Sequence, residues 1–199
     1  MVDVDTVAPV AAVRHRRRAV APFVAVALAV VLAALVVVLA KGKPAVDRFA
    51  KSPLVGKAAP AVAGTTYDGS EFALADHKGS WVVVNFFAPW CVPCRQEQPA
   101  LASFSQRHRV AGDGVELVGV VWNTPPDQLS AFQSTDGGDW PLVLDPHGQI
   151  GVDYGVAAMP ETYIVDPSGF IRAKFSSAVT SDGLDQVITD LRNGVDPNR

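Results

Sequence analysis

Cys91 and Cys94 are the residues of this sequence whose type and spacing most directly offer chemistry, and they lie in the segment Trp90-Cys91-Val92-Pro93-Cys94. They are the only two cysteines in 199 residues, so they cannot form a framework of disulfides spread along the chain. A bridge between them closes too short a loop to restrict the unfolded chain much. We therefore interpret the pair as a redox-active dithiol that exchanges with other thiols and disulfides.

Two other interpretations exist for neighbouring cysteines, namely a zinc site and an inert buried disulfide. Structural zinc requires four ligands, and the sequence has no second Cys-X-X-Cys and no closely paired histidines. His77, His108 and His147 are isolated along the chain, as surface or turn histidines usually are. We therefore expect no metal site and no cofactor.

The elements around the two cysteines predict how they react. The apolar run 81–87 is typical of a buried strand, and a helix is predicted from about residue 92 to 110. Free N–H groups and the dipole at the start of that helix favour an anion, so the pKa of the Cys91 thiol should lie below the free value of about 8.5. Cys94 lies one turn further into the helix, so we expect Cys91 to be the nucleophile and Cys94 the resolving thiol. Pro93 should stiffen the pair and tune its redox poise.

Strands and helices alternate through the rest of the chain, which predicts an α/β fold with a mixed central sheet flanked by helices. A turn at 67–70 indicates an N-terminal β-hairpin, and the turn at 166–169 indicates a second hairpin near the end. Besides 81–87, the expected strands are 115–122, 141–144, 162–165 and 170–175, and the expected later helices are 127–134, 149–154 and 181–191.

A separate feature precedes this domain. Residues 19–40 form an apolar run of 22 residues without a charge, and as a helix this run spans roughly 33 Å. Arginines concentrated on its N-terminal side predict a single transmembrane anchor with the C-terminal part outside the cell membrane. A cleaved signal peptide remains the alternative, because the small residues of 38–40 resemble a cleavage site.

These observations divide the chain into four parts: a basic cytoplasmic segment 1–18, a transmembrane anchor 19–40, a linker 41–57 and a folded domain 58–199. The net charge is −3, and a nucleic-acid-binding protein usually presents a basic face. We therefore expect no nucleic-acid partner.

The segment 84–99, with the sequence VNFFAPWCVPCRQEQP, resembles the active-site segment of the TlpA/ResA/CcmG (DsbE) family of extracytoplasmic thioredoxin-like proteins. Further stretches agree in the same order, at 56–60, 68–69 and 159–166, so the resemblance covers roughly residues 56–190. It implies a thioredoxin-like fold for the folded domain.

The resemblance also implies a substrate-binding surface beside the cysteines. Pro160 is expected to follow a cis peptide bond, the alternative being a trans proline that starts a strand. That geometry would expose the backbone of Met159 to an extended partner chain. Trp90 is expected to cover the site and contact partners together with Pro93, and Pro99 to kink the active-site helix.

Two further residues bear on proton transfer. Asn85 stands where cytoplasmic thioredoxins carry a buried aspartate, and an amide cannot accept the proton of the resolving thiol. Glu97, one helical turn beyond Cys94, resembles the acidic residue of this family and is the candidate acceptor. The alternative for Glu97 is a solvated glutamate on the helix surface.

Three functions are compatible with these residues. The resemblance favours a reductase for disulfides of exported proteins, above all apocytochrome c in cytochrome c maturation, supplied with electrons by a membrane thiol reductant. A disulfide-forming oxidase of the same fold is the second. The third is a module that holds client chains in the groove at Pro160.

Overall fold

The structure is a computed structural model that describes residues 21–41 and 52–197, and within the first helix the side chains of residues 23–34. The chain divides into two units, residues 1–43 and 44–199. The domain boundaries predicted within residues 1–20 and 42–51 lie outside the described residues.

The N-terminal unit contains one helix, α1 (Ala21–Lys41). Its large apolar side chains between Phe23 and Leu32 are exposed. In the described part of the chain, no helix is found to be long and apolar enough to cross a membrane.

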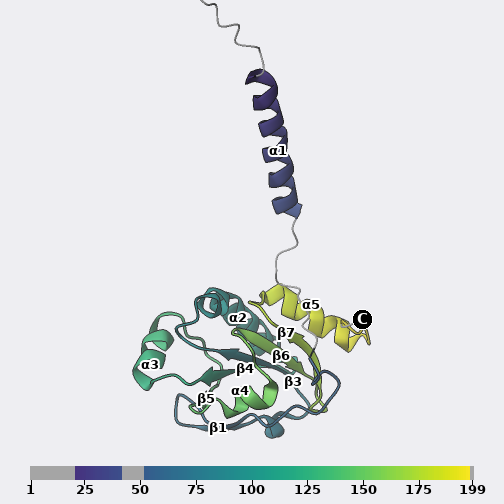
Figure 1. Cartoon of the computed structure of the whole chain (residues 1–199). Coiled ribbons are helices and arrows are strands. Elements are labelled where there is room, and N and C mark those ends of the chain that lie inside the picture. Colours follow the sequence, from purple (N-terminus) through teal and green to yellow (C-terminus); the bar gives the residue numbers. More distant parts are fainter. Residues whose placement is uncertain (1–20, 42–51, 198–199) are drawn as a thin grey trace, which may run out of the picture. The chain divides into compact units, whose positions relative to one another are not determined.

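The second unit is built on a five-stranded sheet with the strand order β5-β4-β3-β6-β7 (Figure 1). β4 is parallel to both of its neighbours, β3 and β5. β6 is antiparallel to β3, and β7 is antiparallel to β6. The sheet is therefore mixed, as predicted. The strands are β3 (Trp81–Phe87), β4 (Val115–Trp122), β5 (Leu142–Asp145), β6 (Glu161–Val165) and β7 (Ile171–Phe175).

Helices cover both faces of this sheet. One face packs against α2 (Val92–Ala111) and α5 (Ser181–Arg192), and the other packs against α4 (Gln149–Tyr154) and the hairpin of β1 (Ala63–Thr65) and β2 (Glu71–Ala73) (Figure 1). A 3-10 turn, η2 (Leu74–His77), and the helix α3 (Pro126–Thr135) complete the unit. This is the thioredoxin-like α/β fold predicted from the sequence.

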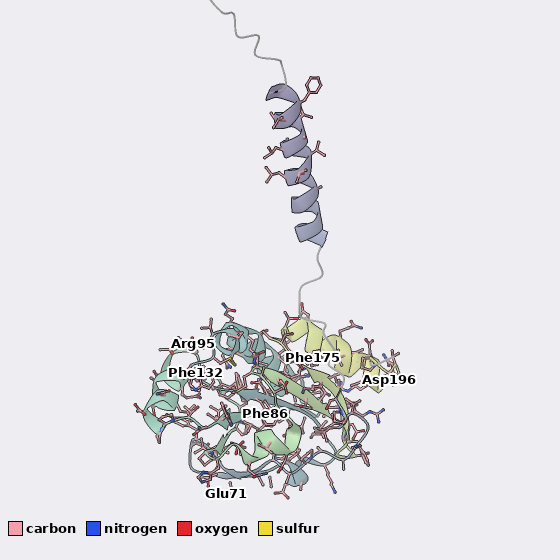
Figure 2. The ribbon with its side chains drawn as sticks, viewed as in Figure 1. Glu71, Phe86, Arg95, Phe132, Phe175 and Asp196 are labelled. Carbon is pink, nitrogen blue, oxygen red and sulfur yellow. A yellow bond between two sulfur atoms is a disulfide. The ribbon has the colours of Figure 1, made fainter. Side chains whose placement is uncertain are left out.

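The centre of the sheet forms because β3 is apolar on both sides. Val83 and Phe87 point into the core under α2 and α5, whereas Val82, Val84 and Phe86 point into the core under α4 and the hairpin. A strand covered on both faces is expected to show such a continuous apolar run. Figure 2 shows Phe86 deep among the side chains of the folded unit.

The folded part of the chain begins before residue 58. The backbone N–H of Gly56 donates to the carbonyl of Ile171 at 2.7 Å, and Leu54 and Val55 pack against the core. Residues 52–57, which the sequence suggested as the end of a linker, are thus attached to the edge of the sheet at β7.

Candidate active site

Cys91 and Cys94 form a disulfide at the start of α2, with their Cα atoms 5.2 Å apart. Cys91 is the N-cap of the helix, and the backbone N–H of Cys94 donates to its sulfur at 3.3 Å. Pro93 occupies the first turn, where a helix has no use for the missing N–H. The helix start thus directs a backbone donor at the Cys91 sulfur, an arrangement that favours a thiolate there after reduction.

The two sulfurs differ in their access to solvent. Cys94 is completely buried, whereas Cys91 retains 6% exposure and lines a surface cleft. A partner thiol that approaches the disulfide from the cleft therefore meets Cys91.

The segment before β6 lies against Cys91. The peptide bond between Met159 and Pro160 is cis, which confirms the prediction for Pro160. The carbonyl oxygen of Met159 lies 3.5 Å from the sulfur of Cys91. A sulfur in a disulfide carries no hydrogen, so this is a contact, and it places the Met159 backbone beside the reactive atom.

The cleft beside Cys91 has a volume of about 650 Å³ and no charged residue in its lining. Trp90 and Trp122 form one wall, with their ring centroids 6.1 Å apart. Trp90 is 56% exposed, and Val152 on α4, which also lines the cleft, is 71% exposed. The remaining lining residues are Phe86, Cys91, Val92, Pro93, Gly148, Gly151, Val156, Ala157, Ala158 and Met159.

Trp122 and Val152 were not predicted from the sequence. Gly148 lies against Trp122: its backbone has a φ of 70°, and its position leaves no room for a side chain. A Cβ atom built there would lie 2.4 Å from Nε1 of Trp122. The glycine therefore lets the indole lie against the start of α4.

Glu97 is buried at 2% exposure, so the alternative of a solvated glutamate is wrong. Its Oε1 accepts from Nδ2 of Asn85 at 2.9 Å, and its Oε2 accepts from the backbone N–H of Val179 at 3.0 Å. Burial raises the pKa of the Glu97 carboxyl to about 7, although both hydrogen bonds act in the opposite direction. A carboxyl with this pKa can both accept and release a proton near neutral pH.

Asn85 ties this carboxyl to the sheet. Its Nδ2 also donates to Oγ1 of Thr162 at 3.0 Å, across the pairing of β3 with β6. Its Oδ1 is buried without a hydrogen-bond partner. Rotation of the amide would offer that oxygen to a protonated Glu97, so the pair can accommodate either state of the carboxyl.

A buried ion pair lies directly after Pro160 and was missed in the sequence. Nζ of Lys174 lies 2.8 Å from Oε2 of Glu161, and the side chains are 9% and 3% exposed. Spacing gave no sign of it, because the two residues lie on different strands that the β6–β7 hairpin brings together.

Two of the described histidines, His77 and His108, contact side chains of the folded unit. His77 stacks on Phe72 and contacts Glu116, and His108 lies between Asp113 and Asp185. No group of three or more metal-ligating side chains occurs in the described ranges 21–41 and 52–197.

A profile of the AhpC/TSA family matches residues 55–174. The thiol:disulfide interchange protein HelX of Rhodobacter capsulatus is 38% identical over 145 residues, which cover 71% of this chain and 78% of HelX. The thiol-disulfide oxidoreductase ResA of Geobacillus thermodenitrificans is 28% identical over 138 residues, or 69% of this chain and 78% of ResA.

Solved structures agree with this. A crystal structure described as a putative thiol:disulfide interchange protein DsbE from Chlorobium tepidum superposes with a TM-score of 0.60 at 28% identity, covering 66% of this chain and 93% of that one. The chain belongs to the AhpC/TSA family of thioredoxin-like proteins. Within it, the protein is a thiol–disulfide oxidoreductase of the ResA, DsbE and HelX type.

Proposed function

We propose that this oxidoreductase reduces disulfides of exported proteins, apocytochrome c among them, with Cys91 as the nucleophile and Cys94 as the resolving thiol. The observation that carries the assignment of these two roles is the difference in solvent access between the two sulfurs. Cys91 lines the cleft beside Met159, whereas Cys94 is buried behind it. The relatives named ResA and DsbE support the general type of reaction.

The reaction proceeds by two exchanges. The Cys91 thiolate attacks one sulfur of the client disulfide, forms a mixed disulfide and releases the other client sulfur as a thiolate that takes up a proton. Cys94 then loses its proton to Glu97 and attacks the Cys91 sulfur, which releases the second client sulfur as a thiolate that takes up a proton and leaves the Cys91–Cys94 disulfide. A membrane thiol reductant returns two electrons and two protons to that disulfide.

We propose that the client chain binds along the cleft next to Cys91. An extended client can pair its backbone with that of Met159, the residue before Pro160, while its side chains meet Trp90 and Pro93. The lining has no charge and includes exposed apolar side chains, which favours apolar residues next to the client cysteine.

We further propose that residues 19–40 anchor the protein in the cell membrane with the folded domain outside. The support is the uncharged run of 22 residues with arginines on its N-terminal side. Mass spectrometry of the mature protein tests retention of the anchor. A mature chain that begins after residue 40 would show instead that the segment is a cleaved signal peptide.

The direction of electron flow is tested by titrating the Cys91–Cys94 couple against a glutathione or dithiothreitol buffer. A reductase should have a potential near that of thioredoxin, about −270 mV. A potential near −120 mV, that of a strong oxidant, would refute reduction and favour disulfide formation.

Client binding in the cleft is tested with Val152→Glu, which places a charge on the exposed rim. The rate with a peptide disulfide flanked by apolar residues should fall by about ten-fold, because the peptide loses apolar contact next to a carboxylate. The rate with a small disulfide such as dithiodipyridine should stay the same. Val110→Glu is the matched control, since Val110 is 80% exposed at the far end of α2. Equal peptide rates for the two variants would contradict binding in the cleft.

A further inference from the structure

The segment 157–159 forms the wall of the cleft next to Cys91, and its position depends on a side chain that follows it. Oε1 of Glu161 accepts a hydrogen bond from the backbone N–H of Ala157 at 3.4 Å. This bond closes a short loop around Met159, whose carbonyl oxygen contacts the Cys91 sulfur. The carboxylate of Glu161 thus lies behind the surface that meets the client.

A buried carboxylate needs a compensating charge to stay ionised. Glu161 is 2% exposed, and Lys174 on β7 supplies an ammonium 2.8 Å from its Oε2. The hydroxyl of Tyr163 lies 3.3 Å from the same oxygen and donates to the carbonyl of Tyr154 at 2.7 Å. Lys174 also lies over the ring of Tyr163, 5.2 Å from its centroid, which holds the ammonium in place.

The two carboxylate oxygens therefore have separate partners. Oε2 faces the ammonium of Lys174, and Oε1 is left to accept from Ala157. We infer that Glu161 is a positioning residue: its carboxylate, fixed by Lys174 from β7, holds the backbone of Ala157 to Met159 in the place where a client chain meets Cys91. This inference rests on the proposed binding of clients in the cleft.

A structural role and a positioning role of the Glu161–Lys174 pair lead to different expectations for variants of these two residues. If the pair only neutralises buried charge, any two uncharged side chains of similar size should replace it. If it positions the loop, the replacement at 161 must also keep an acceptor for the N–H of Ala157. Lys174→Met/Glu161→Gln keeps that acceptor, whereas Lys174→Met/Glu161→Met removes it.

The experiment measures mixed-disulfide formation by the reduced full-length chain in detergent, with an apolar peptide disulfide and with dithiodipyridine. Lys174→Met/Glu161→Gln should retain a peptide rate within about two-fold of the native protein. Lys174→Met/Glu161→Met should lose about ten-fold or more, because small displacements of a positioning segment are costly. Both should react with dithiodipyridine at the native rate, since Cys91 itself is unchanged.

Arg172→Met is the matched control, because it removes a cation from an exposed position on the same strand, near Asp166. Its peptide rate should equal that of the native protein. Equal peptide rates for the two double variants overturn the inference while leaving the proposed function intact. If Val152→Glu and Val110→Glu react with the peptide at equal rates, client binding in the cleft fails, and the inference fails with it.

Circular dichroism checks that each variant is folded. Should Lys174→Met/Glu161→Met not fold, the other double variant still decides the matter. For Lys174→Met/Glu161→Gln, a peptide rate ten-fold below native with an unchanged dithiodipyridine rate would overturn the inference, because the acceptor for Ala157 is still present.

Discussion

Replacing the buried Glu97 by glutamine should change how the stability of the folded protein depends on pH. Glu97 is 2% exposed, and burial raises the pKa of its carboxyl from 4.5 to about 7. The folded protein therefore holds this proton more tightly than the unfolded chain does. In the native protein this carboxyl lowers stability as the pH rises from 4.5 to about 7, and the loss persists at higher pH.

The size of the effect follows from the shift in the pKa of Glu97. One pKa unit corresponds to 1.36 kcal/mol, so a shift from 4.5 to about 7 corresponds to about 3 kcal/mol of lost stability once the carboxyl is ionised. The introduced glutamine has no such loss. Its oxygen can accept from Val179, and its amide can donate to Oδ1 of Asn85 after that side chain rotates, using an oxygen that is now unpartnered.

The assay is urea unfolding of the oxidised native protein and of Glu97→Gln, below pH 4.5 and above about pH 7. The stability of the variant relative to native should rise by about 3 kcal/mol between the two conditions. Glu71→Gln is the control for the chemical change itself, since Glu71 is an exposed glutamate at the surface of β2 (Figure 2).

A relative stability of Glu97→Gln that is the same at both pH values would refute the reasoning. The same variant tests the proposed proton transfer. If Glu97 takes the proton of Cys94, the mixed disulfide on Cys91 should persist longer in Glu97→Gln above pH 7, as followed by quenching and mass spectrometry. An unchanged lifetime would contradict that role.

Two further predictions concern the disulfide and the cleft. Limited alkylation of the reduced protein, mapped by mass spectrometry, should modify Cys91 well before Cys94, because only Cys91 lines the cleft; equal rates would contradict the assigned roles. Gly148→Ala and Gly155→Ala both place alanine at a φ near +70°, at a cost of about 1–2 kcal/mol in urea unfolding. Only Gly148→Ala should also slow exchange with an apolar peptide, since its Cβ would displace Trp122, and equal peptide rates would show that Trp122 does not shape the cleft.

The elements of the fold could be predicted because their signals are local. The strand β3 is a continuous apolar run, and α5 buries Leu184, Val187 and Ile188 at helical spacing. The start of α3 differed slightly, since that helix begins at Pro126 with Pro125 at its N-cap, one residue before the predicted start at 127. Each of these features depends on neighbours within a few residues of sequence.

The surroundings of the site depend on long-range pairing and could not be predicted in that way. Phe87 pairs with Val121 in parallel β3 and β4, so Trp122 emerges beside the loop that carries Trp90. The spacing of Glu97 from Cys94 placed both on one side of α2 but did not show that this side faces Asn85 and the core.

The sequence by itself determined the dithiol, the order of strands and helices, and the proline before β6, since residue types and short spacings carry that information. Only the tertiary structure decided which cysteine lines the cleft, that Glu97 is buried, and that Lys174 pairs with Glu161. These properties arise where the start of α2, the β6–β7 hairpin and the end of β4 meet, and burial and charge pairing there depend on strand pairing and packing between residues far apart in the chain.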